Sequence, residues 1–157
     1  MKLLDIVSAV VVVDFVTIVL SKFFNLGKSL DKWYKKFGMT AVLSDCLIIV
    51  LGIQLALLIE PKAGWFHLLM MALAIQVFHD IWFYFAIVVP IPKGHNEMID
   101  LFKEYADENS YKIVVADSLM VVSTVVLAET LSYYHESVVS FVGLLATYAL
   151  TYIIYTK

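Results

Sequence analysis

Apolar residues in this chain are gathered into long runs separated by short polar segments. A helix needs roughly 20 apolar residues to cross a bilayer. Five runs have about that length: Leu3–Phe24, Phe37–Leu58, Trp65–Val89, Ile113–Tyr133 and Val138–Tyr155. The pattern predicts an all-α integral membrane protein with five transmembrane helices, in which residues 1–157 form a single membrane domain.

The segment between the third and fourth spans has an amphipathic pattern. Within Asn96–Asn109, the apolar residues Met98, Leu101, Phe102 and Tyr105 fall on one helical stripe, and acidic residues occupy the opposite face. The segment is predicted to be an interfacial amphipathic helix, lying on the membrane or against a partner. Its acidic face favours a protein partner over an anionic lipid surface.

The order of segments occurs twice along the chain. "LSDCLIIV" and "VADSLMVV" align at an offset of 72 residues, which places Asp45 over Asp117, and upstream of them "LDKWY" and "LFKEY" share Leu, Lys and Tyr. Trp33 and Tyr34 in the first of these are expected to anchor at the membrane interface. The pattern predicts two tandem helical hairpins, related as a parallel repeat about an axis along the membrane normal, plus a fifth helix.

The repeat extends to the spans that precede these segments. Asp14 in the first span and Asp80 in the third have similar places before the ends of their spans. The repeat also predicts that the fourth span begins early, at about Asp107–Glu108, which would bring Asp117 as deep into the bilayer as Asp45.

Composition agrees with a membrane protein and suggests an orientation. Hydrophobic residues make up 62% of the chain, above the roughly 45–50% of a typical soluble domain. All basic residues are lysines, and five spans put Lys2 and Lys62 on one side and the other nine on the opposite side. The positive-inside rule then predicts an external N-terminus and a cytosolic C-terminus, which carries Lys157.

Carboxylates within the apolar runs are the main candidates for function. Asp14, Asp45, Asp80 and Asp117 each lie on the small or polar face of their helix, the face that packs against other helices, so these four carboxylates are expected to converge inside one bundle. The candidate polar core, structural or ion-binding, consists of Asp14, Asp45, Gln76, His79, Asp80 and Asp117.

Two roles fit such a core. In the first, neutral acids hydrogen-bond across helices and hold the bundle together. In the second, the core binds a cation or relays protons, because several ionised carboxylates could not coexist there without bound cations. The first role is favoured, since no known metal-ligand spacing occurs and His79 and Asp80, as sequence neighbours, point about 100° apart on a helix.

Catalytic chemistry has little support in the sequence. It contains no Gly-rich phosphate loop, no HExxH motif, no nucleophile elbow and no basic-aromatic groove for nucleic acid. We therefore expect neither an enzyme nor a cofactor, and the identity of any metal is left open.

The segments "AVLSDCLIIVLGI", "QVFHDIWFYF", "MIDLFKEYA" and "VADSLMVV" resemble, in their order, small multi-pass membrane proteins of large nucleocytoplasmic DNA viruses that infect algae and protists. The resemblance covers about Leu30–Ala128 and implies residence in the internal membrane of the virion or in the host endomembrane from which it forms. It also implies contact with capsid-side proteins and assigns no catalytic residue.

These observations favour a structural multi-pass membrane protein of a viral internal membrane, with other membrane or capsid proteins, or further copies of the chain, as partners. The alternative is a small proton or cation channel or transporter that uses the intramembrane aspartates.

Overall fold

The computed structural model describes residues 1–24 and 28–156, and within these ranges the regular structure is entirely helical. The all-α prediction is therefore confirmed. Proline interrupts none of the helices, because Pro61, Pro90 and Pro92 all lie in connections. The elements are α1 (Leu3–Phe24), α2 (Lys28–Phe37), α3 (Met39–Ile59), α4 (Trp65–Phe83), the π-helix η1 (Tyr84–Val88), α5 (Glu97–Asn109), α6 (Lys112–Leu131) and α7 (Glu136–Ile153).

Five helical segments are long and apolar enough to cross a membrane, and they correspond to the five predicted spans: α1, α3, α4 continued by η1, α6 and α7. Their outward faces carry large apolar side chains, such as Leu51 (61% exposed), Phe78 (70%) and Leu144 (70%). Continuous apolar surface of this kind is rare on soluble monomers. It indicates a lipid environment around the bundle.

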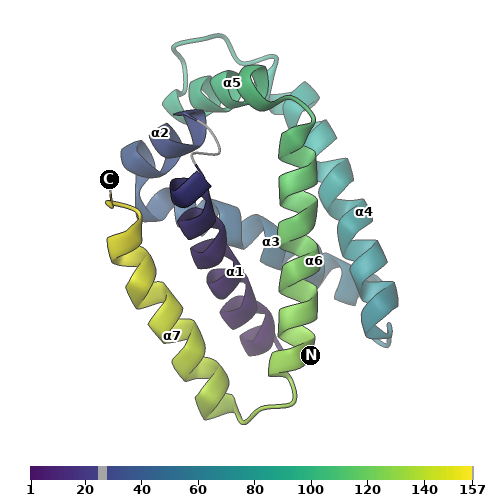
Figure 1. Cartoon of the computed structure of the whole chain (residues 1–157). Helices are drawn as coiled ribbons and strands as arrows, with labels where there is room; N and C mark the ends of the chain where they lie inside the picture. Colours follow the sequence, from purple (N-terminus) through teal and green to yellow (C-terminus); the bar gives the residue numbers. More distant parts are fainter. Residues whose placement is uncertain (25–27, 157) are drawn as a thin grey trace.

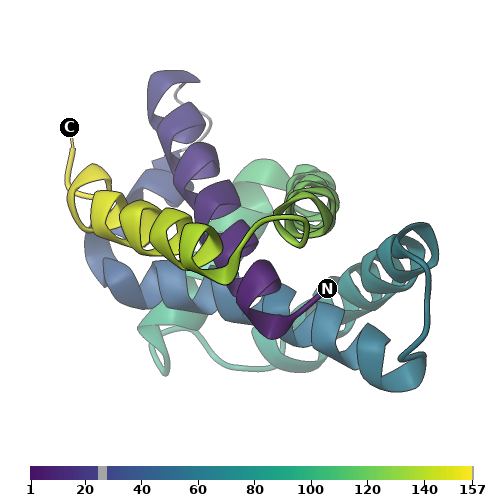
Figure 2. The same ribbon diagram turned by 90° about the horizontal axis from the view of Figure 1, so that it is seen from below.

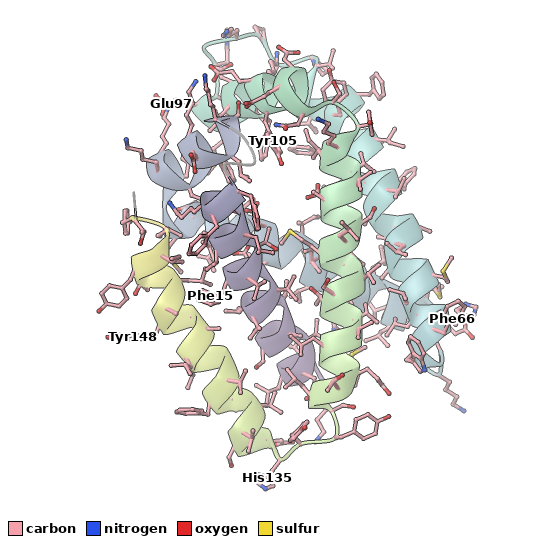
Figure 3. The ribbon with its side chains drawn as sticks, in the orientation of Figure 1. Phe15, Phe66, Glu97, Tyr105, His135 and Tyr148 are labelled. Atoms are coloured by element: carbon pink, nitrogen blue, oxygen red, sulfur yellow. The ribbon has the colours of Figure 1, made fainter. Side chains whose placement is uncertain are left out.

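Four of the spans form a ring. α1 packs against α3 and α6, and α4 packs against the same two helices. α7 lies outside the ring and packs along α1, on the opposite side of the bundle from α4 (Figures 1 and 2). Phe15 of α1 points toward α7, whereas Tyr148 of α7 points away from the bundle (Figure 3).

The predicted repeat appears in the order and the contacts of the elements. Span, short helix and span follow one another as α1, α2, α3 and again as α4, α5, α6. Gly38 ends α2 with φ 53° and ψ −130°, and Ser110, 72 residues later, ends α5 with φ 50° and ψ −130°. The same left-handed break thus separates short helix and span in both halves, and α7 is the added fifth span.

Two predicted boundaries need correction. The fourth span does not begin at Asp107–Glu108, because the positive φ of Ser110 ends α5 and α6 starts only at Lys112. The third span is not α-helical throughout, since its last turn widens into η1, where the Val89 N–H donates to the Tyr84 carbonyl. The aliphatic and aromatic residues there gave no signal for a π-helix.

The two ends of the bundle differ in lysine content, as the spacing of spans predicts. The N-terminus, the α3–α4 turn and the α6–α7 turn lie at the lysine-poor end, and α2, α5 and the end of α7 lie at the lysine-rich end (Figure 1). Lys157 falls outside the described residues. At the lysine-poor end Lys2 pairs with Glu136 at 2.6 Å, which ties the start of α1 to the start of α7.

Candidate functional site: an intramembrane carboxylate row

The two short helices pack together and cover the lysine-rich end of the bundle (Figure 1). We call α2 and α5 together the platform. They run antiparallel: Glu108, near the end of α5, accepts from the backbone N–H groups of Lys28 and Ser29, at the start of α2. Lys32 and Glu104 pair midway at 2.8 Å. A two-fold axis along the membrane normal would relate α2 to α5 in this way.

The apolar stripe of α5 faces the protein itself. Leu101 is 6% exposed, and Met98 and Phe102 pack against the buried core. Tyr105 points from α5 toward the bundle, as Figure 3 shows. Part of the acidic face of α5 pairs with lysines of α2, as Glu104 does with Lys32 and Glu97 with Lys36.

Asp45 of α3 joins the platform to the bundle. Its Oδ2 accepts hydrogen bonds from Trp33 Nε1 at 3.1 Å and from Tyr34 Oη at 3.0 Å. The expectation that Trp33 and Tyr34 anchor at the membrane interface is wrong, because each is 5% exposed and turned toward α3. Burial, followed by the nearby carboxylates, raises the pKa of the Tyr34 hydroxyl, so that it stays protonated and remains a donor.

The second half repeats this arrangement in part. Tyr105 corresponds to Tyr34 in the repeat. It lies near enough to Asp117 for the charge of that carboxylate to act on the Tyr105 hydroxyl. Burial is the larger cause that raises the pKa of Tyr105, and Asp117 is the next. The platform therefore places one tyrosine hydroxyl near the carboxylate of each half.

Asp80 of α4 is held within its own helix. Its Oδ1 accepts from Gln76 Nε2 at 2.7 Å and lies 3.3 Å from His79 Nδ1. The His79 ring stacks on Phe83 with 5.6 Å between centroids. Although they are neighbours in sequence, His79 and Asp80 thus form a polar pair within α4, with the Phe83 ring packed beside it.

Asp14 of α1 differs from the other aspartates. It is fully buried, and neither carboxylate oxygen has a hydrogen-bond partner. Asp45 lies close enough for the two charges to interact, and the Cys46 thiol is also nearby. Asp14 is thus the most enclosed aspartate of the candidate core, and both of its carboxylate oxygens lack a hydrogen-bond partner.

The four aspartates form a row of neighbours rather than a shell around one point. Charge interactions link Asp14 with Asp45, Asp45 with Asp117, and Asp117 with Asp80. Within residues 1–24 and 28–156, no three His, Cys, Asp or Glu side chains are grouped so that they could hold a metal ion. The row offers carboxyl groups that can accept hydrogen bonds and bind protons.

Sequence reasoning missed several members of this core. The sequence predicts Trp33 and Tyr34 at the interface, and it does not single out Thr124, whose buried hydroxyl has no hydrogen-bond partner. Close contact between α1 and α7 was also missed, where a Cβ on Gly143 would lie 2.6 Å from Ser8 Oγ. The only available signal was the polar or small character of these residues in apolar runs.

Comparison of the chain with protein-family models, with curated proteins and with solved structures found no match.

Proposed function

We propose that this chain is a structural multi-pass membrane protein, a component of the internal membrane of a virus, whose platform faces capsid-side proteins. The observation that supports a structural role most directly is the use of Asp45. Both hydrogen bonds to its carboxylate come from α2 and fix the platform on the bundle. Intramembrane carboxylates used in this way stabilise helix packing.

The exposed surface of the platform supports contact with proteins. Besides the paired residues, it carries Lys35 and Asp100. Together with Lys93 of the α4–α5 connection and with Lys32, Lys36 and Glu104, these residues line a cleft of about 520 Å³ between the two helices and that connection. A cleft of mixed charge suits a protein surface better than a uniformly anionic lipid surface, which attracts basic clusters. The viral source rests on the resemblance of segment order alone.

The location of the protein in infected cells tests this proposal. Particles are purified, their internal membrane is released with detergent, and the chain is quantified in each fraction by mass spectrometry. We expect it to be abundant in the particle and to be released together with the membrane lipid. A chain that is scarce in particles and resides in host membranes would contradict the structural role in the virion.

A further inference from the structure

The structural role leaves one buried carboxyl group unexplained. Asp45 and Asp80 have hydrogen-bond donors, whereas Asp14 is fully buried with both oxygens unpartnered. A buried polar group without a partner is costly, and an ionised carboxylate in that state is far more costly. Some further interaction must therefore stabilise Asp14.

The repeat shows how Asp14 came to lack partners. In α4, the residues four and one positions before Asp80 are Gln76 and His79, and both contact its carboxylate. In α1, the residues four and one positions before Asp14 are Val10 and Val13, which are 0% and 8% exposed. The polar neighbours of one half are thus replaced by valines in the other, while the aspartate itself is retained.

The helices packed against α1 supply no positive charge beside Asp14. From α3 come Asp45 and Cys46, and from α2 comes Tyr34, all neutral or negative groups. On α6, Asp117 lies next to Asp45, and Lys112 and Glu129 lie toward the two ends of the helix. On α7, Glu136 pairs with Lys2, and Tyr148 and Tyr152 are exposed on the outer face.

The surroundings of Asp14 are poorly suited to bind a metal ion. Calcium takes six to eight oxygen ligands and magnesium demands six in near-ideal geometry, whereas the described part of the chain gathers no three His, Cys, Asp or Glu side chains at one point. The valines beside Asp14 offer no oxygen to complete a shell. A proton needs only the carboxylate itself.

We propose that Asp14 is a proton-binding site within the membrane-spanning bundle. Its carboxyl group binds one proton on an Oδ atom and releases it to Asp45, so that Asp14 becomes the carboxylate and Asp45 the acid. Asp45 is hydrogen-bonded to Tyr34 and Trp33 of the platform. The proton therefore enters and leaves the bundle at its lysine-rich end. This site goes beyond the structural role, which uses Asp45 only as a hydrogen-bond acceptor.

Infrared difference spectroscopy of the full chain in zwitterionic lipid vesicles tests the site. The wild-type protein is measured while the pH is raised from mildly acidic to mildly alkaline, and the C=O stretching band of protonated carboxylic acid is followed. We expect a band that disappears with rising pH and that is lost in Asp14→Asn. The exposed Asp31→Asn variant serves as the matched control and retains the band.

A second variant keeps the test decisive if Asp14→Asn does not fold. Val10→Gln places beside Asp14 the donor that Gln76 provides to Asp80, and we expect it to shift the Asp14-dependent band to lower frequency. A wild-type spectrum without pH-dependent loss of that band, or a Val10→Gln spectrum identical to the wild type, would overturn the proposal. Neither result would affect the structural role of Asp45.

Discussion

At the scale of single residues, the chain uses the same residue type in three different surroundings. Asp45 accepts bonds from another helix, Asp80 accepts bonds from its own helix, and Asp14 has no donor. An aspartate near the bilayer centre costs about 2.5–3.5 kcal/mol on insertion scales. Its neighbours therefore decide whether it stabilises packing or serves as a proton site.

Asp45→Leu is expected to loosen the platform, because it leaves the buried donors of Trp33 and Tyr34 without an acceptor. Each unsatisfied donor costs about 1–3 kcal/mol. In a background where Trp65 and Trp82 are replaced by Phe, the emission of Trp33 should shift to longer wavelength. Asp45→Asn keeps a carbonyl acceptor and should leave the emission nearly unchanged, as should the exposed Ser44→Ala. Equal emission spectra for Asp45→Leu and the wild type would contradict the claim that Asp45 holds the platform on the bundle.

At the scale of elements, close approach and charge pairing fix how helices meet. α7 touches α1 at Gly143, where any Cβ would collide with Ser8. Small residues at helix contacts are the usual way in which membrane helices approach closely. α2 and α5 meet through lysine–glutamate pairs, which are exposed to solvent and contribute little individually, and through the rings of Trp33 and Phe102, whose centroids lie 4.9 Å apart.

Gly143→Ala should weaken the packing of α7 on α1. The added Cβ would lie 2.6 Å from Ser8 Oγ and 3.2 Å from its Cα, so backbone must move, and overpacking of this kind costs about 1–3 kcal/mol. Gly52→Ala is the matched control, since its Cβ would meet Ile75 at 3.7 Å, an ordinary contact. Unfolding in mixed detergent micelles should have its midpoint at a lower denaturant concentration for Gly143→Ala than for the wild type, and at the wild-type concentration for Gly52→Ala. The same midpoint for both variants would contradict this contact.

Acid should release the first turn of α2 from α5. The hydrogen bond and charge of Lys32 lower the pKa of Glu104, and the side chain of Ser29, followed by the backbone N–H groups of Ser29 and Lys28, lowers the pKa of Glu108. A lowered carboxyl pKa stabilises the folded state above the ordinary value of 4.5, and this contribution is lost as the pH falls through the lowered value. At acidic pH the amide groups of Lys28 and Ser29 should therefore lose protection from hydrogen exchange, after correction for the intrinsic pH dependence of exchange. In Glu108→Gln that acid-dependent loss should be much smaller.

At the scale of the whole molecule, two halves of three elements interlock and a fifth span is added. The five spans could be predicted from the lengths of the apolar runs. The repeat could be predicted from the spacing of Asp45 and Asp117. The inward position of Trp33 was not predictable, because aromatic residues near a span end usually lie at the interface. Nor was the late start of α6, because the left-handed conformation of Ser110 repeats that of Gly38 without repeating its residue type.

The orientation that the lysines predict for the bundle can be measured directly. In a Cys46→Ser background, Lys62→Cys and Tyr134→Cys should react with a membrane-impermeant maleimide added outside intact cells. Lys93→Cys, at the lysine-rich end, should react only after the membrane is permeabilised. The positive-inside rule predicts this result, and the reverse labelling pattern would invert the proposed topology.

The central claim is that two related halves meet across a two-fold axis at the platform, where α2 and α5 must run antiparallel. Cross-linking of cysteine pairs in native membranes, with Cys46→Ser as background and a short bismaleimide, tests this most directly. We expect efficient cross-links for Lys32→Cys with Glu104→Cys and for Lys28→Cys with Glu108→Cys, which lie in register. Lys28→Cys with Glu97→Cys should not cross-link. Efficient cross-linking of that last pair, without the other two, would show a parallel arrangement and contradict the account.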